Sequence, residues 1–76
     1  MVTAYVMVKA LTGDADGIKQ AIADVEGVVD VHIVAGDVDL IAKLDVASPA
    51  DVKDIAANQI HSIDGVDGTQ TYIAME

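Results

Sequence analysis

The stretch VEGVVDVHIVAGDVDLIAKLDV, residues 25–46, decides how this chain folds. It is rich in valine and isoleucine, which favour strands, and a short polar interruption divides it. After the interruption, apolar residues recur at every second position, the spacing of a half-buried strand: Val38, Leu40, Ala42, Leu44 and Val46. The stretch therefore predicts two neighbouring strands, the first from about Val28 to Val34, joined by a short turn around residues 35–37.

The polar interruption is GDVD, residues 36–39. Gly36 is expected to supply the unusual backbone angle of a hairpin turn, and Asp37 is expected to close that turn. Asp39 shares its strand face with Ile41, so this carboxylate lies beside an apolar surface and needs a partner. The sequence shows no evident partner in the chain itself, and the ammonium group of a ligand is one candidate.

The flanking sequence predicts the remaining elements. Before the central stretch, residues 2–10 alternate like a strand, and a helix with its apolar stripe at Ile18, Ala21, Ile22 and Val25 precedes a capping glycine, Gly27. After it, SPAD (48–51) is a helix start with Ser48 as N-cap and Pro49 in the first turn. That helix is expected to run to Ile63 and to stop at Gly65, and GTQTYIAM (68–75) is the last strand.

The element order β-α-β-β-α-β predicts a single α+β domain, residues 1–76, with the ferredoxin-like fold. A half-repeat supports this order, because VEGV (25–28) recurs as IDGV (63–66). We expect a four-stranded antiparallel sheet with both helices on one face. The other face is too apolar to be left in water, so we expect two sheets to pack together as a homodimer through Tyr5, Met7, His32, Val34, Ile41 and Tyr72.

The charge balance restricts the partners. The chain has thirteen acidic residues, four lysines, no arginine and a formal net charge of -9. Such a surface repels nucleic acids and anionic membranes, so we expect neither as a direct partner. The same composition suits a protein from a halophile, because high salt screens the self-repulsion. With no cysteine, no basic leader and no membrane-length apolar run, the default expectation is a cytoplasmic protein.

The residues suggest no catalytic or metal chemistry, and no cofactor is expected. DADG (14–17) resembles the start of a calcium loop, but Val25 occupies the position where a bidentate glutamate is required, so a helix start explains it better. His32 and His61 are the only imidazoles, and they fall on different elements without a further ligand at a suitable spacing. No serine is accompanied by a pattern of histidine and aspartate that would activate it.

Together these residues resemble the effector-binding domain of the Lrp/AsnC regulators, also called the RAM domain. The resemblance rests on the element order, on GV after each helix, on the G-D-x-D turn before a long third strand, and on a last strand that contains threonine. It covers residues 2–75 and is most specific over residues 25–46. Because the first strand begins at Val2, the resemblance is to stand-alone members that lack the helix-turn-helix domain.

The resemblance implies a non-catalytic amino acid sensor that assembles as a dimer or a larger ring, or with full-length regulators. In this family small amino acids bind in clefts at interfaces, to which the turn before the third strand and parts of the last strand contribute. The resemblance therefore implies a ligand-binding set of Gly36, Asp37, Val38, Asp39, Thr69, Gln70 and Thr71. Backbone N–H groups near Gly36 would bind the carboxylate, and Asp37 or Asp39 the ammonium. Two other interpretations remain open: a small dimeric monooxygenase or isomerase that uses His32 or Tyr72 in an enclosed pocket, and a purely structural assembly partner.

Overall fold

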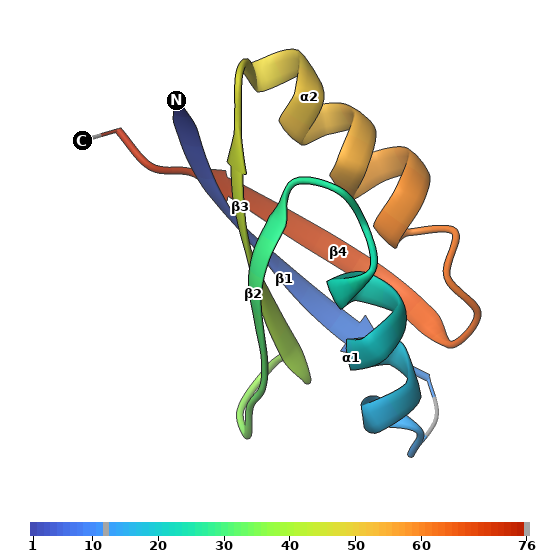
Figure 1. Ribbon diagram of the computed structural model, residues 1–76. Coiled ribbons are helices and arrows are strands. Elements are labelled where there is room, and N and C mark those ends of the chain that lie inside the picture. Colours follow the sequence, from blue (N-terminus) through green and yellow to red (C-terminus); the bar gives the residue numbers. More distant parts are fainter. Residues whose placement is uncertain (12, 76) are drawn as a thin grey trace.

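A computed structural model describes residues 1–11 and 13–75 of the chain. The elements follow the predicted order: β1 (Val2–Ala10), α1 (Ala15–Ala23), β2 (Val28–Ile33), β3 (Leu40–Val46), α2 (Pro49–Lys53), the π-helical segment η1 (Asp54–Ile60) and β4 (Val66–Ile73). The strands form one antiparallel sheet in the order β2-β3-β1-β4. The helices lie together on one face of this sheet (Figure 1). The predicted ferredoxin-like α+β fold is confirmed.

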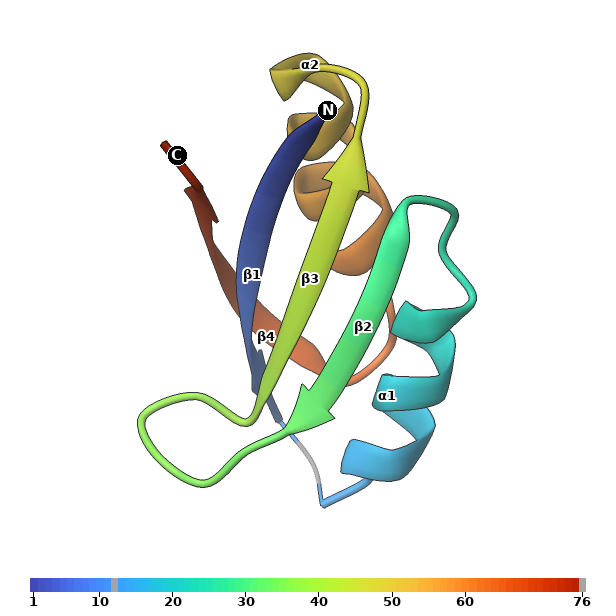
Figure 2. The same cartoon turned by 60° about the vertical axis from the view of Figure 1, so that its left-hand side comes forward.

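The strand register separates the two faces of the sheet. Val6 in β1 lies opposite Ala42 in β3 and Thr71 in β4, whereas Tyr5 lies opposite Lys43 and Tyr72. Because side chains alternate along a strand, the even-numbered residues of β1 face the helices and the odd-numbered ones face away. Figure 2 shows the sheet in front of the helices, with this second side uncovered. We call it the open face.

The core lies between the helices and the covered face of the sheet. It consists of aliphatic side chains, as the low aromatic content of the sequence requires: Ala4, Val6, Val8, Ile18, Ile22, Val31, Leu40, Ala42, Leu44, Val46, Val52, Ile55, Ala56 and Ile60. Ile22 from α1 and Ile60 from η1 are fully buried. Each such side chain contributes about 1.5–3 kcal/mol through removal of its surface from water. The predicted stripe residues Val25 and Ile63 pack against this core at its margin.

The helix starts and the glycines after the helices follow from local sequence. Asp14 caps α1 by accepting a hydrogen bond from the N–H of Gly17 at 3.2 Å, which confirms DADG as a helix start. Ser48 caps α2 by accepting from the N–H of Asp51 at 3.4 Å. Gly27 and Gly65 adopt positive φ angles of 100° and 95°, where a side chain would be strained.

The second helix differs from the regular helix that its apolar spacing predicts. From Asp54 onward it is π-helical, and the N–H of His61 donates to the carbonyl of Ala56, five residues earlier. The wider turn brings Asn58 and Gln59 to the same carboxylate: their amide nitrogens donate to Asp54 at 2.9 and 3.1 Å. Apolar spacing alone does not distinguish this winding from an α-helix over such a short segment.

The connection between β2 and β3 is a longer loop than the predicted turn. It spans residues 34–39, because β2 ends at Ile33 and β3 begins at Leu40. In the described part of the chain, positive φ angles occur at Gly27 and Gly65 and not at Gly36. The expectation for Gly36 is therefore wrong: a loop of this length does not need the left-handed residue that a two-residue hairpin requires.

Candidate functional site

Backbone hydrogen bonds fix both ends of the β2–β3 loop. The N–H of Val34 donates to the carbonyl of Asp39 at 2.9 Å, and the N–H of Asp39 donates to the carbonyl of Val8 at 2.9 Å. The first bond closes the loop on itself, and the second ties it to β1. Figure 2 shows the loop projecting beyond the end of the sheet from these attachments.

The carboxylate of Asp39 adds a third attachment. Its Oδ2 accepts a hydrogen bond of 2.8 Å from the backbone N–H of Ala10, and the residue is half-buried. The expectation that Asp39 has no partner in its own chain is therefore wrong. Spacing along one strand could not show this partner, because it belongs to the end of β1. In this arrangement the aspartate positions the loop.

Beside the loop lies a cavity of about 420 Å³ on the open face. Its lining comes from β1, the loop and β4: Met7, Lys9, Asp37, Val38, Gly68, Thr69 and Gln70. The structure thus brings Asp37 and Val38 together with Thr69 and Gln70, as the predicted ligand-binding set requires. That these residues bind a ligand stays a prediction.

Three members of the predicted set lie outside this lining. Asp39 is tied to Ala10, and Gly36 lies at the exposed part of the loop. Thr71 instead lines a groove of about 280 Å³ between β4 and the second helix, and Thr69 lines this groove as well as the cavity. It lies opposite Val6, whose side chain is in the core, so the pleat of the strand turns Thr71 to the covered face.

Sequence patterns did not indicate Lys9 and Gly68 as lining residues, and they placed Met7 only on the apolar face. The position of these residues depends on the pairing of β1 with β4, in which Met7 lies opposite Gln70 and Lys9 opposite Gly68. The two strands are far apart in the sequence. The alternation of each strand indicated its two faces, but not which residues of the other strand lie beside it.

The lining carries one charge of each sign. Lys9 comes from the sheet, and Asp37 comes from the loop. In the described part of the chain, neither side chain forms an ion pair or a hydrogen bond. A cation and an anion are thus available at the edge of one depression whose other side chains include the apolar Met7 and Val38.

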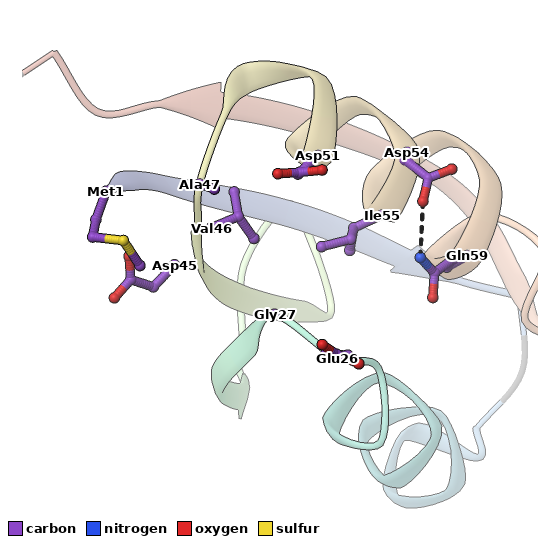
Figure 3. A pocket seen from close by; sticks show the side chains of 10 residues that line it. All are labelled: Met1, Glu26, Gly27, Asp45, Val46, Ala47, Asp51, Asp54, Ile55 and Gln59. Atoms are coloured by element: carbon purple, nitrogen blue, oxygen red, sulfur yellow. Dashed lines mark hydrogen bonds between the residues drawn. The ribbon is translucent and has the colours of Figure 1, made fainter.

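A larger cavity of about 480 Å³ lies elsewhere in the molecule and is acidic (Figure 3). Its charged lining residues are Glu26, Asp45, Asp51 and Asp54. The hydrogen bonds from Asn58 and Gln59 hold the pKa of Asp54 below its ordinary value. No residue of the predicted set lines this cavity, and all the charged side chains in its described lining are acidic. Among the described residues, no group of three or more acidic or histidine side chains is arranged to hold a metal ion.

The two histidines lie apart. His32 on β2 is paired with Asp30, with Nε2 to Oδ2 at 3.2 Å, and its side chain is 68% exposed. His61 follows η1. Neither His32 nor Tyr72, the residues that the enzyme alternative would use, lines the cavity beside the loop. Within the described residues, no helix is long and apolar enough to cross a membrane.

The fold and the cavity define a class: a small α+β module whose open sheet face carries a depression between a hairpin loop and an edge strand. The model of the Lrp/AsnC ligand binding domain matches residues 3–76. The chain belongs to this family, which confirms the resemblance. No curated protein matches the chain.

Solved structures support the assignment of the fold. TTHA0845 from Thermus thermophilus is 29% identical with a TM-score of 0.94, and the match covers 100% of this chain and 95% of that protein. E. coli AsnC is 17% identical with a TM-score of 0.90, covering 99% and 51%. The Neisseria meningitidis transcriptional regulator NMB0573, solved as a complex with L-Met, is 14% identical with a TM-score of 0.85, covering 99% and 50%. The chain spans about half the length of these two regulators.

Proposed function

We propose that this chain is a non-catalytic amino acid-binding module that acts in transcription regulation of the Lrp/AsnC type. The observation that carries the proposal is the cavity beside the β2–β3 loop, where Asp37 and Val38 lie with Thr69 and Gln70. Its volume of about 420 Å³ is near the lower end of the range, about 300–1,000 Å³, that small-molecule pockets occupy. Family membership and the L-Met complex of the Neisseria regulator support an amino acid as the ligand.

A homodimer through the open face fits the same proposal. Tyr5 and Tyr72 lie opposite each other on this face and are 37% and 55% exposed. The register also places Lys9 and Lys43 on it with Asp30 and Asp45, and Asp37 lies at its edge, so this face is much less negative than the whole chain, which carries -9. A second copy is therefore repelled only weakly there, and a two-fold interface needs such a self-complementary surface.

The mechanism that we propose is a population shift. An amino acid that binds one assembly more tightly than another favours that assembly, whether a homodimer, a ring or a mixed complex with a full-length regulator. The module itself would contact neither nucleic acid nor membrane, because its net charge of -9 opposes both.

The test of ligand binding is calorimetric titration of the protein with each of the twenty amino acids, in low and in molar KCl. We expect binding heat for at least one amino acid with an apolar side chain, and a change of mass by light scattering. No heat for any amino acid would overturn the sensor. If the chain then still captured a full-length Lrp/AsnC regulator, the structural-partner interpretation would replace it.

A variant that fills the cavity beside the β2–β3 loop tests whether the measured binding heat comes from this cavity. Gly68 has open space where a Cβ would lie, and it sits opposite Lys9 on the open face. Gly68→Val should therefore fold normally and lose the amino acid heat. Gly13→Val is the matched control, because a Cβ at Gly13 also meets nothing and this residue is outside the cavity. Equal heats in both variants would place the ligand elsewhere.

The homodimer has a separate test by light scattering at micromolar concentration. Ile41 lies between Met7 and His32 on the open face, so Ile41→Asp should place a charge in the interface and give a monomeric mass. Leu11→Asp is the control, because Leu11 is 69% exposed and lies outside the sheet. A monomeric mass of the unmodified protein would contradict the dimer.

A further inference from the structure

Lys9 is the one lysine that reaches the cavity beside the β2–β3 loop in the described part of the chain. Lys43 lies on the open face opposite Tyr5, Lys19 is in α1 and Lys53 is in α2. A ligand carboxylate that approaches a chain of net charge -9 is repelled unless a local cation offsets the field. Lys9 is the group in position to do so.

Asp37 lines the same cavity from the loop, and it forms no ion pair with Lys9. The two charges thus face the depression from different elements without neutralising each other. An α-amino acid carries both complementary charges, an ammonium and a carboxylate, on neighbouring atoms. A molecule with only one of them would leave one of these side chains without a partner.

The wall around these charges is mainly apolar, and Thr69 and Gln70 of β4 are its uncharged polar residues. Met7 and Val38 are apolar, and Gly68 presents no side chain opposite Lys9. A Cβ built on Gly68 meets nothing within 4 Å, so there is room above β4 beside the lysine. An aliphatic or thioether side chain of a ligand can contact Met7 and Val38, whereas a charged side chain would lose hydration there.

We propose, resting on the function proposed above, that Lys9 binds the carboxylate and Asp37 the ammonium of an amino acid whose apolar side chain contacts Met7 and Val38. Each charged group of the ligand is thus assigned to one named side chain, and Lys9 becomes a binding residue. It replaces the backbone N–H groups near Gly36 as the carboxylate site. Charge-assisted hydrogen bonds of this kind are expected to contribute about tenfold or more in affinity.

The experiment compares L-valine, L-leucine and L-methionine with their carboxamides, which keep the ammonium and lack the carboxylate. Titrations are made with the unmodified protein, Lys9→Gln and Lys19→Gln at one fixed KCl concentration, because Lys19 is exposed in α1 and lies outside both the cavity and the open face. The amides should bind the unmodified protein about tenfold more weakly than the acids. Lys9→Gln should remove that difference by weakening the acids alone, and Lys19→Gln should keep it.

Asp37→Asn tests the other end of the ligand. Because acids and amides share the ammonium, this variant should weaken both about equally. Circular dichroism of each variant checks the fold, and both side chains are exposed, so neither substitution disturbs the core.

The outcomes separate this inference from the proposed function. If the unmodified protein binds one of the amino acids but Lys9→Gln binds acid and amide as the unmodified protein does, the lysine assignment is overturned and the sensor stands. If Lys9→Gln weakens acid and amide alike, the lysine acts through the shape of the cavity and the assignment also fails. If none of the twenty amino acids binds the unmodified protein, both proposals fall.

Discussion

The Oδ2 atom of Asp39 accepts a hydrogen bond of 2.8 Å from the backbone N–H of Ala10, a residue 29 positions earlier in the chain. This bond lies just beyond the last β1–β3 pair, Val8 with Leu40. It therefore gives the N–H of Ala10 an acceptor where the ladder has ended, and it holds the β2–β3 loop against the end of β1.

Removing this carboxylate should destabilise the fold. In Asp39→Ala the half-buried N–H of Ala10 loses its acceptor, which costs about 1–3 kcal/mol of the free energy of unfolding. Asp39→Asn keeps a carbonyl oxygen at the same place and should cost less. Urea denaturation at fixed salt measures both, and an alanine variant as stable as the unmodified protein would contradict the role of the bond.

Gly27 and Gly36 should respond in opposite ways to alanine. Gly27 has a φ of 100°, and an added Cβ would lie 2.7 Å from Cδ1 of Ile55 in the core. Gly27→Ala is therefore expected to cost more than about 1 kcal/mol of unfolding free energy. Gly36 has no positive φ and open space around it, so Gly36→Ala should be neutral or stabilise by about 0.4–1 kcal/mol.

Thermal unfolding of the two glycine variants measures this contrast. The pair also tests the conformation of the loop, because a hairpin turn that needed Gly36 in the left-handed region would make Gly36→Ala the costly substitution. Equal losses in both variants would contradict the loop described above.

Asp54 should titrate below its ordinary pKa of 3.8, because the amides of Asn58 and then Gln59 donate to its ionised form. Asn58→Ala should raise the pKa of Asp54 toward that value, and Gln59→Ala should raise it less. Since the folded-state pKa is the lower one, the stabilisation is present above pH 3.8 and is lost as the pH falls through the folded-state pKa. Carbon NMR titration of the carboxyl follows this directly, and an unmoved pKa in both variants would contradict the assignment.

Salt should stabilise the protein. A net charge of -9 on 76 residues makes the acidic side chains repel one another. The Debye length, which sets the range of this repulsion, falls from about 10 Å at 0.1 M salt to about 3 Å at 1 M. The midpoint of thermal unfolding is therefore expected to rise between low and molar KCl, with sodium chloride as the control for a specific potassium effect. An unchanged midpoint would argue against adaptation to a salt-rich interior.

Local sequence patterns predicted most of the fold. The alternation of residues 2–10 and 38–46 indicated the covered face of β1 and β3, and the spacing of Ile18 and Ile22 indicated the buried side of α1. These predictions succeeded because burial of apolar side chains on one face of a strand or helix leaves a period of 2 or 3.6 in the sequence. The π-helical segment after Asp54 is too short for the spacing of its apolar residues to distinguish it from an α-helix.

The candidate site was predicted less completely. Asp37, Val38, Thr69 and Gln70 line one cavity as the family resemblance implied, whereas Thr71 lines only the groove on the other side of the sheet, which Thr69 also borders. Lys9 and Gly68 were missed, because their place in the cavity depends on how β1 pairs with β4 and not on any motif around either residue.

The sequence by itself determined the element order, the two sheet faces and the position of the polar loop, since each depends on contacts within one element or on chain punctuation by glycine, serine and proline. Only the tertiary structure decided what the two loop aspartates do. Asp39 is bound by a backbone N–H from the end of another strand, and Asp37 is left facing a cavity beside Lys9. Both outcomes depend on strand register, which brings together groups that no local pattern relates.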